Sequence, residues 1–142
     1  MAVLTGYLNE VSVQELIDCV TRNEGCNGGD FDYAFDFAAK RGLSSFSDYR
    51  FIQGEGTCRA GQYPIVSRID NAYETRVCST SDLMDKVAQR PVAVAIDGSC
   101  DAFVHYSGGI FTASCGRELN HAVTVVGYGT DVATGTPYWC VE

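Results

Sequence analysis

The sequence predicts an α+β fold, with helices in its first half and strands in its second half. In segments 12–20 and 30–42, apolar residues recur at helical spacing behind capping residues. After residue 91 the pattern changes to short valine-rich runs, which are typical of strands. A chain of 142 residues can hold one domain or two small lobes. We therefore expect a helical part over 1–74 and a β-rich part over 75–142.

Two helices in the first half have clear start signals. Ser12 and Glu15 form a capping box, in which the hydroxyl opens a helix over 13–20 and the carboxylate reaches back to the Ser12 N–H. Asp30 caps a second helix, which ends in a basic turn followed by a glycine. The predicted apolar faces of these helices consist of Leu16, Ile17, Val20, Phe31, Ala34, Phe35 and Ala38.

A glycine-rich segment separates the two helices. Residues 25–29 contain three glycines, which predicts a tight loop without regular structure. A glycine loop before a helix can cradle an anion, but this one lacks the lysine and the spacing of a phosphate-binding loop. Residues 43–76 also read as loops, and we expect Cys58 to anchor them.

The second half begins with a helix and continues with strands. Ser79 to Ser81 offer caps for a helix that Pro91 ends. Val92–Ile96 is predicted to be a buried strand, and a hairpin turn is expected over 129–137. The further strands predicted are Tyr106–Thr112, His121–Tyr128 and Tyr138–Val141.

Composition excludes several classes of partner. The formal net charge of −8 has the wrong sign for nucleic acid or an anionic membrane surface. The longest uncharged apolar run, Pro91–Ile96, is far shorter than the ~20 residues of a membrane span. No basic segment followed by an apolar run opens the sequence, so we expect no signal peptide within it.

The sequence contains seven cysteines and no C-x-x-C pair. With only two histidines, the sequence offers few of the ligands that a zinc site needs, and we expect no metal. The spacing is typical of a disulfide framework in an oxidising compartment. Because the number is odd, at least one thiol is free, pairs between chains, or has a partner outside these residues.

Both histidines are ambiguous when taken alone. His121 opens an apolar strand, where a histidine can be a general base, a metal ligand or a packed residue. His105 lies among aromatic residues, where the packed interpretation is stronger.

Four motifs together resemble the papain family of cysteine proteases (cathepsin-like, peptidase C1). They occur in the family's order and extend over most of the chain. The motifs are Ser12-Val13-Gln14-Glu15-Leu16-Ile17-Asp18-Cys19, Gly25-Cys26-Asn27-Gly28-Gly29, Tyr106-Ser107-Gly108-Gly109-Ile110-Phe111, and Leu119-Asn120-His121-Ala122-Val123 with Val126-Gly127-Tyr128-Gly129.

The resemblance implies a papain-like two-lobe fold and a peptidase that needs no cofactor. In this family a cysteine thiolate attacks the peptide carbonyl, a histidine acts as acid and base, and an asparagine orients the imidazole. His121 matches the catalytic histidine. The alternatives are a catalytically inactive papain-like binding or matrix protein, and a small secreted disulfide module unrelated to proteases.

The family's Cys-Gly-Ser-Cys-Trp and Asn-Ser-Trp-Gly motifs are absent from the sequence. Ala2–Leu4 resembles the tail of the family's catalytic helix, so we expect an internal fragment of a longer enzyme, with a genuine pseudoenzyme as the alternative. The chain as written should then be inactive, because no thiolate faces His121.

The resemblance also implies substrate contacts. Gly28 and Gly29 match the backbone segment that pairs with extended substrate. The positions that match substrate-binding residues of the family are Asp30, Phe31, Ala95, Leu119, Asn120 and Ala122. Most of them line the pocket for the second residue before the scissile bond, and we expect that pocket to accept Leu, Val or Phe, with Asp30 tolerating a basic residue at its rim. Endo- and exopeptidase activity are not distinguished.

Disulfides, partners and location follow from the same resemblance. Cys19 and Cys58 match a family disulfide, whereas Cys26 and Cys115 match cysteines whose partners lie outside this sequence. Outside the family's common pattern, Cys78 and Cys100 are expected to form an extra bridge between a helix start and a strand end. Cys140 lies mid-strand among apolar residues and is expected to be a buried free thiol. The implied partners are protein or peptide substrates, a propeptide and cystatin-like inhibitors, acting on a monomer in a lysosome, a vacuole or the extracellular space.

Overall fold

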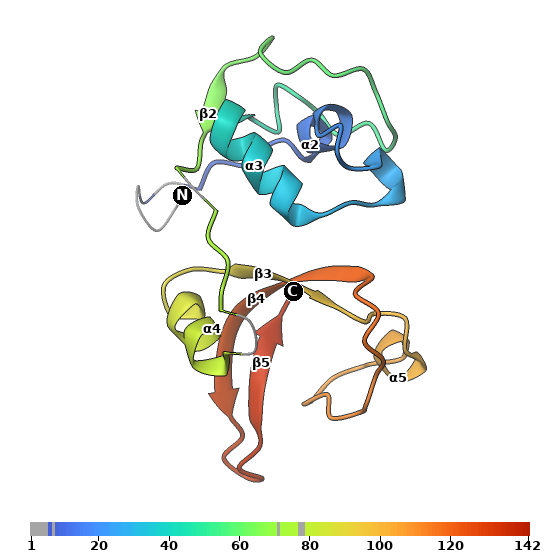
Figure 1. Ribbon diagram of the computed structural model, residues 1–142, viewed down its shortest axis with the longest axis vertical. Coiled ribbons are helices and arrows are strands. Elements are labelled where there is room, and N and C mark those ends of the chain that lie inside the picture. Colours follow the sequence, from blue (N-terminus) through green and yellow to red (C-terminus); the bar gives the residue numbers. More distant parts are fainter. Residues whose placement is uncertain (1–5, 7, 71, 77–78) are drawn as a thin grey trace. The chain divides into compact units, whose positions relative to one another are not determined.

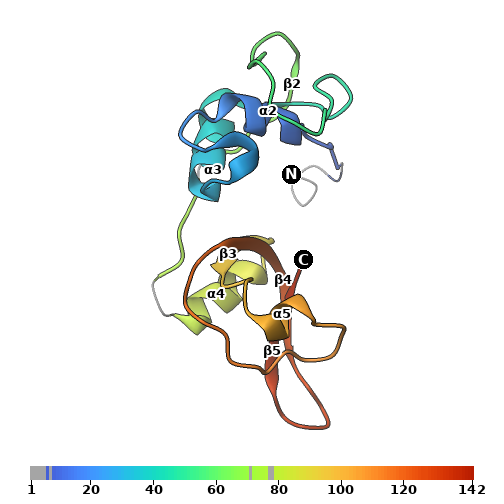
Figure 2. The same cartoon turned by 90° about the vertical axis from the view of Figure 1, so that its right-hand side faces the viewer.

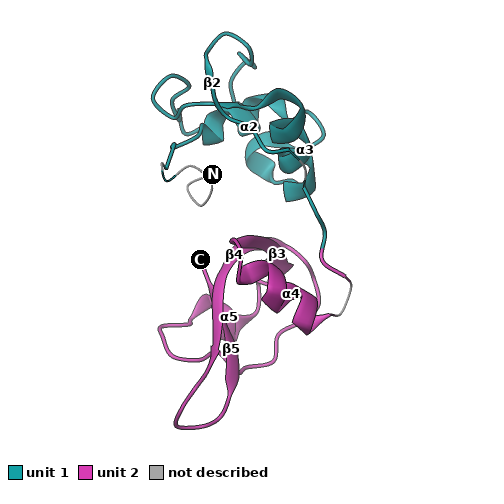
Figure 3. Cartoon of the chain, turned by 90° about the vertical axis from the view of Figure 1, so that its left-hand side faces the viewer, with its two compact units in different colours: residues 1–74 teal, residues 75–142 magenta. Residues whose placement is uncertain are grey.

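The computed structural model describes residues 6, 8–70, 72–76 and 79–142. The chain divides into two compact units, unit 1 over 1–74 and unit 2 over 75–142 (Figure 3). Each unit has its own secondary structure and is described by itself below.

The described residues of unit 1 include two α-helices and a minimal sheet (Figure 1). Helix α2 (Val13–Cys19) begins after Ser12, whose hydroxyl accepts a hydrogen bond from the Glu15 N–H. Helix α3 (Phe31–Arg41) begins after Asp30, whose carboxylate accepts from the Asp32 N–H. Both predicted helices and both caps are confirmed. The remaining elements are the 3₁₀ helix η1 (Gly25–Asn27) and the antiparallel strands β1 (Leu43–Ser44) and β2 (Ile65–Ser67).

The second half of the predicted capping box is wrong. The Ser12 N–H donates to the Ser44 carbonyl at 3.0 Å, so it has no need of the Glu15 carboxylate. That carboxylate accepts from the Ser44 N–H at 2.7 Å instead. The start of helix α2 is therefore linked to strand β1 through both the carbonyl and the N–H of Ser44.

The most buried side chains of unit 1 are polar. Those below 2% exposure are Tyr49, Gln14, Glu15, Ser12 and Ser44. By contrast, Leu16 and Ile17 are only half-buried, although the periodicity predicts them as the buried face of α2. The interior of unit 1 is therefore built on hydrogen bonds from the polar face of α2.

Unit 2 is a three-stranded antiparallel sheet in the order β3–β4–β5. The strands are β3 (Val92–Ile96), β4 (His121–Thr130) and β5 (Pro137–Val141), and all three were predicted. Helix α4 (Thr80–Val87), capped by Ser79, packs against β4 (Figure 2). The core of this unit is apolar and consists of Val87, Val123 and Val125.

Several predicted elements differ from the structure. The segment 106–112 is not a strand, because Gly108 and Gly109 have φ angles of 150° and 85° that a regular strand does not accept. β3 is half-buried along its length rather than buried. Two short helices were not predicted, η1 within the glycine-rich segment and α5 (Asp101–Val104). The helix tail predicted at 2–4 lies outside the described residues.

Candidate active site

His121 is the first residue of β4, opposite Ile96 of β3. Its side chain is exposed, and its ring nitrogens make no hydrogen bond to any residue that the structure describes. The Phe103 ring lies 6.2 Å from the imidazole centroid. A Cβ placed on Gly98 would lie 2.7 Å from the His121 Cβ, so the histidine packs directly on this glycine's backbone. The imidazole is therefore supported on one side and accessible to a reacting group.

A small polar cluster fixes the turn beside His121. The Asn120 side chain accepts from the Gly98 N–H at 2.9 Å and donates to the Ser99 hydroxyl at 3.1 Å. Hydrogen bonds from the Ser99 hydroxyl and backbone N–H, with a smaller contribution from Asn120, hold the pKa of Asp97 below its usual value. The side-chain amide of Asn120 therefore forms hydrogen bonds that hold the end of β3 against the start of β4.

The other predicted site residues of unit 2 lie close to His121. Ala95 and Ala122 are direct partners across the β3–β4 ladder, so their methyl groups share one face of the sheet. Leu119 precedes the strand and is 72% exposed. These residues therefore lie near the start of β4, with Ala95 and Ala122 on the face of the sheet opposite to that of His121.

His105 has a different environment. Its Nδ1 lies 2.8 Å from the Asp101 carbonyl, one turn back in the short helix α5. The ring is therefore engaged with the end of its own helix, and the structure offers no argument for a catalytic role.

The predicted site residues of unit 1 lie on one loop and the start of α3. Gly28 has a φ angle of 125°, which favours glycine, and its carbonyl accepts from the Glu24 N–H at 3.0 Å. Gly29 follows in an exposed position. A shallow hollow beside them is lined by Leu16, Ile17, Asn23, Gly25, Gly28, Gly29, Asp30, Phe31 and Ala34. The lining of this hollow therefore includes the apolar side chain of Phe31 and the carboxylate of Asp30.

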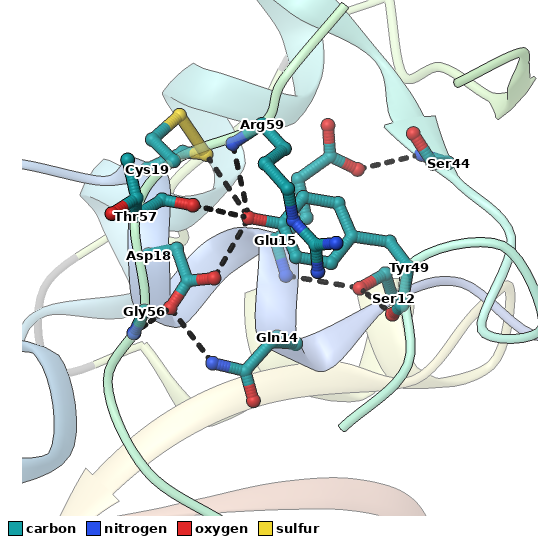
Figure 4. The surroundings of a disulfide bond; sticks show 11 residues. Ser12, Gln14, Glu15, Asp18, Cys19, Ser44, Tyr49, Gly56, Thr57 and Arg59 are labelled. Carbon is teal, nitrogen blue, oxygen red and sulfur yellow. Dashed lines mark hydrogen bonds between the residues drawn. A yellow bond between two sulfur atoms is a disulfide. The ribbon is translucent and has the colours of Figure 1, made fainter. Parts of the chain in front are cut away.

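Elsewhere in unit 1, the Tyr49 hydroxyl occupies the centre of a polar network (Figure 4). It donates to Asp18 at 2.7 Å and accepts from the Arg59 N–H at 3.1 Å. Burial, reinforced by the hydrogen bond to Asp18, raises the pKa of Tyr49. At Asp18, burial favours the neutral form, but the hydrogen bonds from Tyr49, Gly56 and Gln14 outweigh it and lower the pKa. The network holds the segment 49–59 on α2.

Cys19 and Cys58 are joined by a disulfide beside this network. This is the pairing that the family resemblance implies. Together with the hydrogen bonds, it anchors the long irregular segment that follows β1.

The other cysteine predictions are partly wrong. Cys100 and Cys115 are disulfide-bonded, because both lie at the base of the same loop with Cα atoms 5.5 Å apart. Neither the predicted Cys78–Cys100 bridge nor an outside partner for Cys115 is therefore retained, and Cys78 itself lies outside the described residues. Cys140, on β5, is exposed rather than buried. Cys26 forms no disulfide with any residue that the structure describes.

The described part of the chain holds no group of three or more His, Cys, Asp or Glu side chains arranged for a metal ion. Within the same residues, none of the helices combines the length and hydropathy of a membrane span.

Two residues near the candidate site were missed by the sequence reasoning. The Asn23 side chain bonds to the backbone of Asp30, and the Glu55 carboxylate accepts from the Cys26 N–H at 2.8 Å. No periodicity marks either residue. The available signal was the glycine-rich segment itself, since an irregular loop needs side-chain partners for its backbone.

The fold and these side chains define the class of protein. A helical unit with a glycine-rich loop and a β unit that presents a histidine at a strand start form a papain-like α+β fold. The solved structure of bromelain protease from Ananas comosus, in complex with an inhibitor, superposes with a TM-score of 0.92 at 34% identity, covering 99% of this chain and 65% of that one. The proform of the Amb a 11 cysteine protease, a ragweed pollen allergen, gives the same TM-score and identity over 99% of this chain and 39% of its own.

Sequence comparison identifies the family. The family model described as papain family cysteine protease matches residues 1–142. Thiol protease SEN102 of Hemerocallis is 43% identical over 99% of this chain, and fruit bromelain of Ananas comosus is 38% identical over the same share. The chain belongs to the papain family of cysteine proteases. It spans 39% of the length of these two relatives.

Proposed function

We propose that this chain supplies the histidine of a Cys-His-Asn peptidase site and part of the substrate-binding surface. The observation that carries the proposal is the environment of His121, an accessible imidazole supported by Gly98 and Phe103 in the Asn-His-Ala context of a papain family member. This arrangement suits a group that must accept and return a proton at a fixed position.

The proposed role of His121 is that of acid and base. Its imidazole takes the proton of a cysteine thiol, and the resulting thiolate attacks the peptide carbonyl. The imidazolium then protonates the leaving amine, so one side chain serves both half-reactions. The cluster of Asn120, Gly98 and Asp97 holds the backbone at the start of β4, from which this ring projects.

The substrate is proposed to be an extended peptide with an apolar residue second before the scissile bond. Gly29 supports this, because its exposed backbone can pair with a strand. Ala95, Ala122 and Phe31 present small or apolar side chains, which favour Leu, Val or Phe. The carboxylate of Asp30 tolerates a basic group.

The 142-residue chain by itself is predicted to be inactive. Its sequence contains no Cys-Gly-Ser-Cys-Trp motif, and a histidine without a nucleophile cannot cleave a peptide bond. The purified chain is incubated with a dipeptidyl fluorogenic substrate and with an epoxide probe for thiol proteases. We expect neither turnover nor labelling. Turnover accompanied by labelling of any of the seven cysteines would contradict the prediction.

The role of His121 is tested in a longer protein, in which residues 1–142 are flanked by the segments that precede and follow the matched region of fruit bromelain. We expect a bell-shaped pH–rate profile, because the thiolate–imidazolium pair must form and His121 must keep its proton. His121→Ala should remove nearly all turnover. His105→Ala is the matched control and should leave the profile unchanged. An active His121 variant together with an inactive His105 variant would reverse the assignment.

A second candidate is a catalytically inactive papain-like binding or matrix protein, which the absence of the nucleophile motif favours. Sequencing the transcript beyond both ends distinguishes the two. Motifs for the cysteine and asparagine would support the peptidase. An in-frame stop codon upstream of the Met1 codon and another directly after the Glu142 codon would support the binding protein.

Disulfides and family membership are consistent with a secretory or vacuolar protease. We therefore propose a lysosomal, vacuolar or extracellular location. The proposed partners are peptide or protein substrates, a propeptide and cystatin-like inhibitors, and the complete protein is proposed to be a monomer.

A further inference from the structure

The loop that carries Gly28 and Gly29 has little regular structure to hold it. Gly25 and Gly28 both have positive φ angles, and only the three residues of η1 are helical. Glycines give a loop many accessible conformations, so a defined shape requires contacts that select one of them.

Asn23 makes such contacts with both backbone groups of Asp30. Its Oδ1 accepts from the Asp30 N–H at 2.9 Å, and its Nδ2 donates to the Asp30 carbonyl at 3.2 Å. The side-chain amide thus pairs with Asp30 as a neighbouring strand would. A Cβ added to Gly29 would lie 2.4 Å from the Asn23 Cγ, so the Gly29 backbone passes directly over this amide.

The backbone of Gly29 itself is left unpaired. Its N–H and carbonyl make no hydrogen bond to any described residue, and the residue is exposed. An exposed N–H and carbonyl on one residue form the edge to which an extended peptide can add. Asn23 occupies the inner side of this segment and leaves the outer side open.

We propose that Asn23 is a positioning residue for the peptide substrate, which it serves by fixing the direction of the Gly29 N–H and carbonyl. The inference rests on the proposed function, because it takes Gly29 as a substrate contact. Fixing these groups before binding removes the ordering cost that a free glycine loop would incur on association. Asn is suited to this role because it offers one acceptor and one donor, whereas Asp has no donor and Ala has neither.

The test uses the ¹⁵N-labelled 142-residue chain and an acetylated, amidated tetrapeptide with leucine as its second residue. The amide signals of Gly29 and Asp30 are followed by NMR as the peptide is added. We expect both signals to shift with the peptide in the unmodified chain. Asn23→Ala should weaken the apparent affinity by roughly fivefold or more, the effect of losing preorganised hydrogen-bond partners.

Asn27→Ala is the matched control, since Asn27 lies in the same loop, is exposed and makes no side-chain hydrogen bond to a described residue. It should bind the peptide as the unmodified chain does. Asn23→Asp keeps the acceptor for the Asp30 N–H and loses the donor, so we expect intermediate affinity. If the NMR spectrum of Asn23→Ala is not that of a folded chain, Asn23→Asp tests the proposal in its place.

The outcomes separate the inference from the proposed function. No shift at Gly29 in the unmodified chain would contradict the proposed substrate contact and the inference with it. Binding of the peptide by both Asn23 variants as tightly as by the unmodified chain would contradict the positioning role alone. Equal weakening by Asn27→Ala would also contradict it, because the effect would then belong to the loop in general.

Discussion

The two units of this chain hold their candidate site residues in different ways. In unit 2, His121 is part of a β ladder, and its backbone position is set by pairing with β3. In unit 1, Gly28 and Gly29 lie in an irregular loop whose backbone is held by side chains. The comparison shows that the proposed acid–base residue is placed by repetitive secondary structure, whereas the proposed backbone surface for substrate is placed by individual polar side chains.

The polar face of α2 extends this scheme through unit 1. The Gln14 side chain accepts from the Ile52 N–H at 3.0 Å and donates to the Gly54 carbonyl at 2.8 Å. Between them, Gln53 has a φ angle of 59°, a left-handed conformation that few non-glycine residues adopt. Gln14 therefore holds a turn that would otherwise be unfavourable. Glu55, which follows this turn, contacts the glycine-rich loop at Cys26.

Loss of the Cys19–Cys58 disulfide should give the largest effect on this comparison. The bond closes a separation of 39 residues, for which the chain-entropy model gives about 3–4 kcal/mol. In the Cys19→Ser/Cys58→Ser double variant, we expect amide hydrogen exchange to accelerate over 49–59 and less over the β4–β5 ladder. Cys26→Ser is the control, as its thiol forms no disulfide with a described residue. Equal acceleration in both units would contradict the comparison.

The buried carboxylate of Glu15 should have the next largest effect. Glu15→Ala leaves the buried Ser44 N–H without its acceptor, which costs about 1–3 kcal/mol. Glu15→Gln retains an acceptor oxygen and should lose less. Urea unfolding measures the free energy of unfolding of both variants, and amide hydrogen exchange shows whether the loss appears in α2 and β1. A larger loss in Glu15→Gln than in Glu15→Ala would show that the carboxylate does not act as an acceptor there.

The matched change in unit 2 is Val125→Ala. Val125 is 3% exposed, and removing two buried carbons costs about 2 kcal/mol with a small cavity. We expect the loss to appear in exchange of the β4–β5 ladder. The same experiment therefore compares a lost hydrogen-bond acceptor in one unit with lost apolar packing in the other.

Much of the fold was predictable because local signals agree with the final structure. The caps at Ser12 and Asp30 and the valine-rich strands specify elements through short-range contacts alone. The position of His121 at the start of β4 was predictable because the motif around it coincides with the strand. The burial of Gln14 and Glu15 was not, since hydrophobic periodicity assigns polar residues to the surface and cannot show a distant backbone that needs partners. Asn23 was missed for the same reason, because its side chain forms hydrogen bonds with the carbonyl and N–H of Asp30, seven positions away.

The smallest expected effect is the response of unit 1 to acid. Hydrogen bonds from Tyr49, Gly56 and Gln14 outweigh the effect of burial and lower the pKa of Asp18. A carboxyl whose pKa is lower in the folded state contributes stability above its unfolded pKa of about 3.9. That contribution is lost as the pH falls through the folded pKa. We expect exchange at the Gly56 amide, which donates to Asp18 at 2.7 Å, to accelerate as the pH falls below about 4, after correction for the intrinsic rate. Asp18→Asn should remove this acid-dependent step, whereas Asp97→Asn should leave it in place and act on unit 2. If Asp18→Asn and the unmodified chain show the same acid dependence at Gly56, the neutral hydrogen-bond donors alone hold the polar network of α2. The charge of Asp18 then makes no contribution to the stability of unit 1.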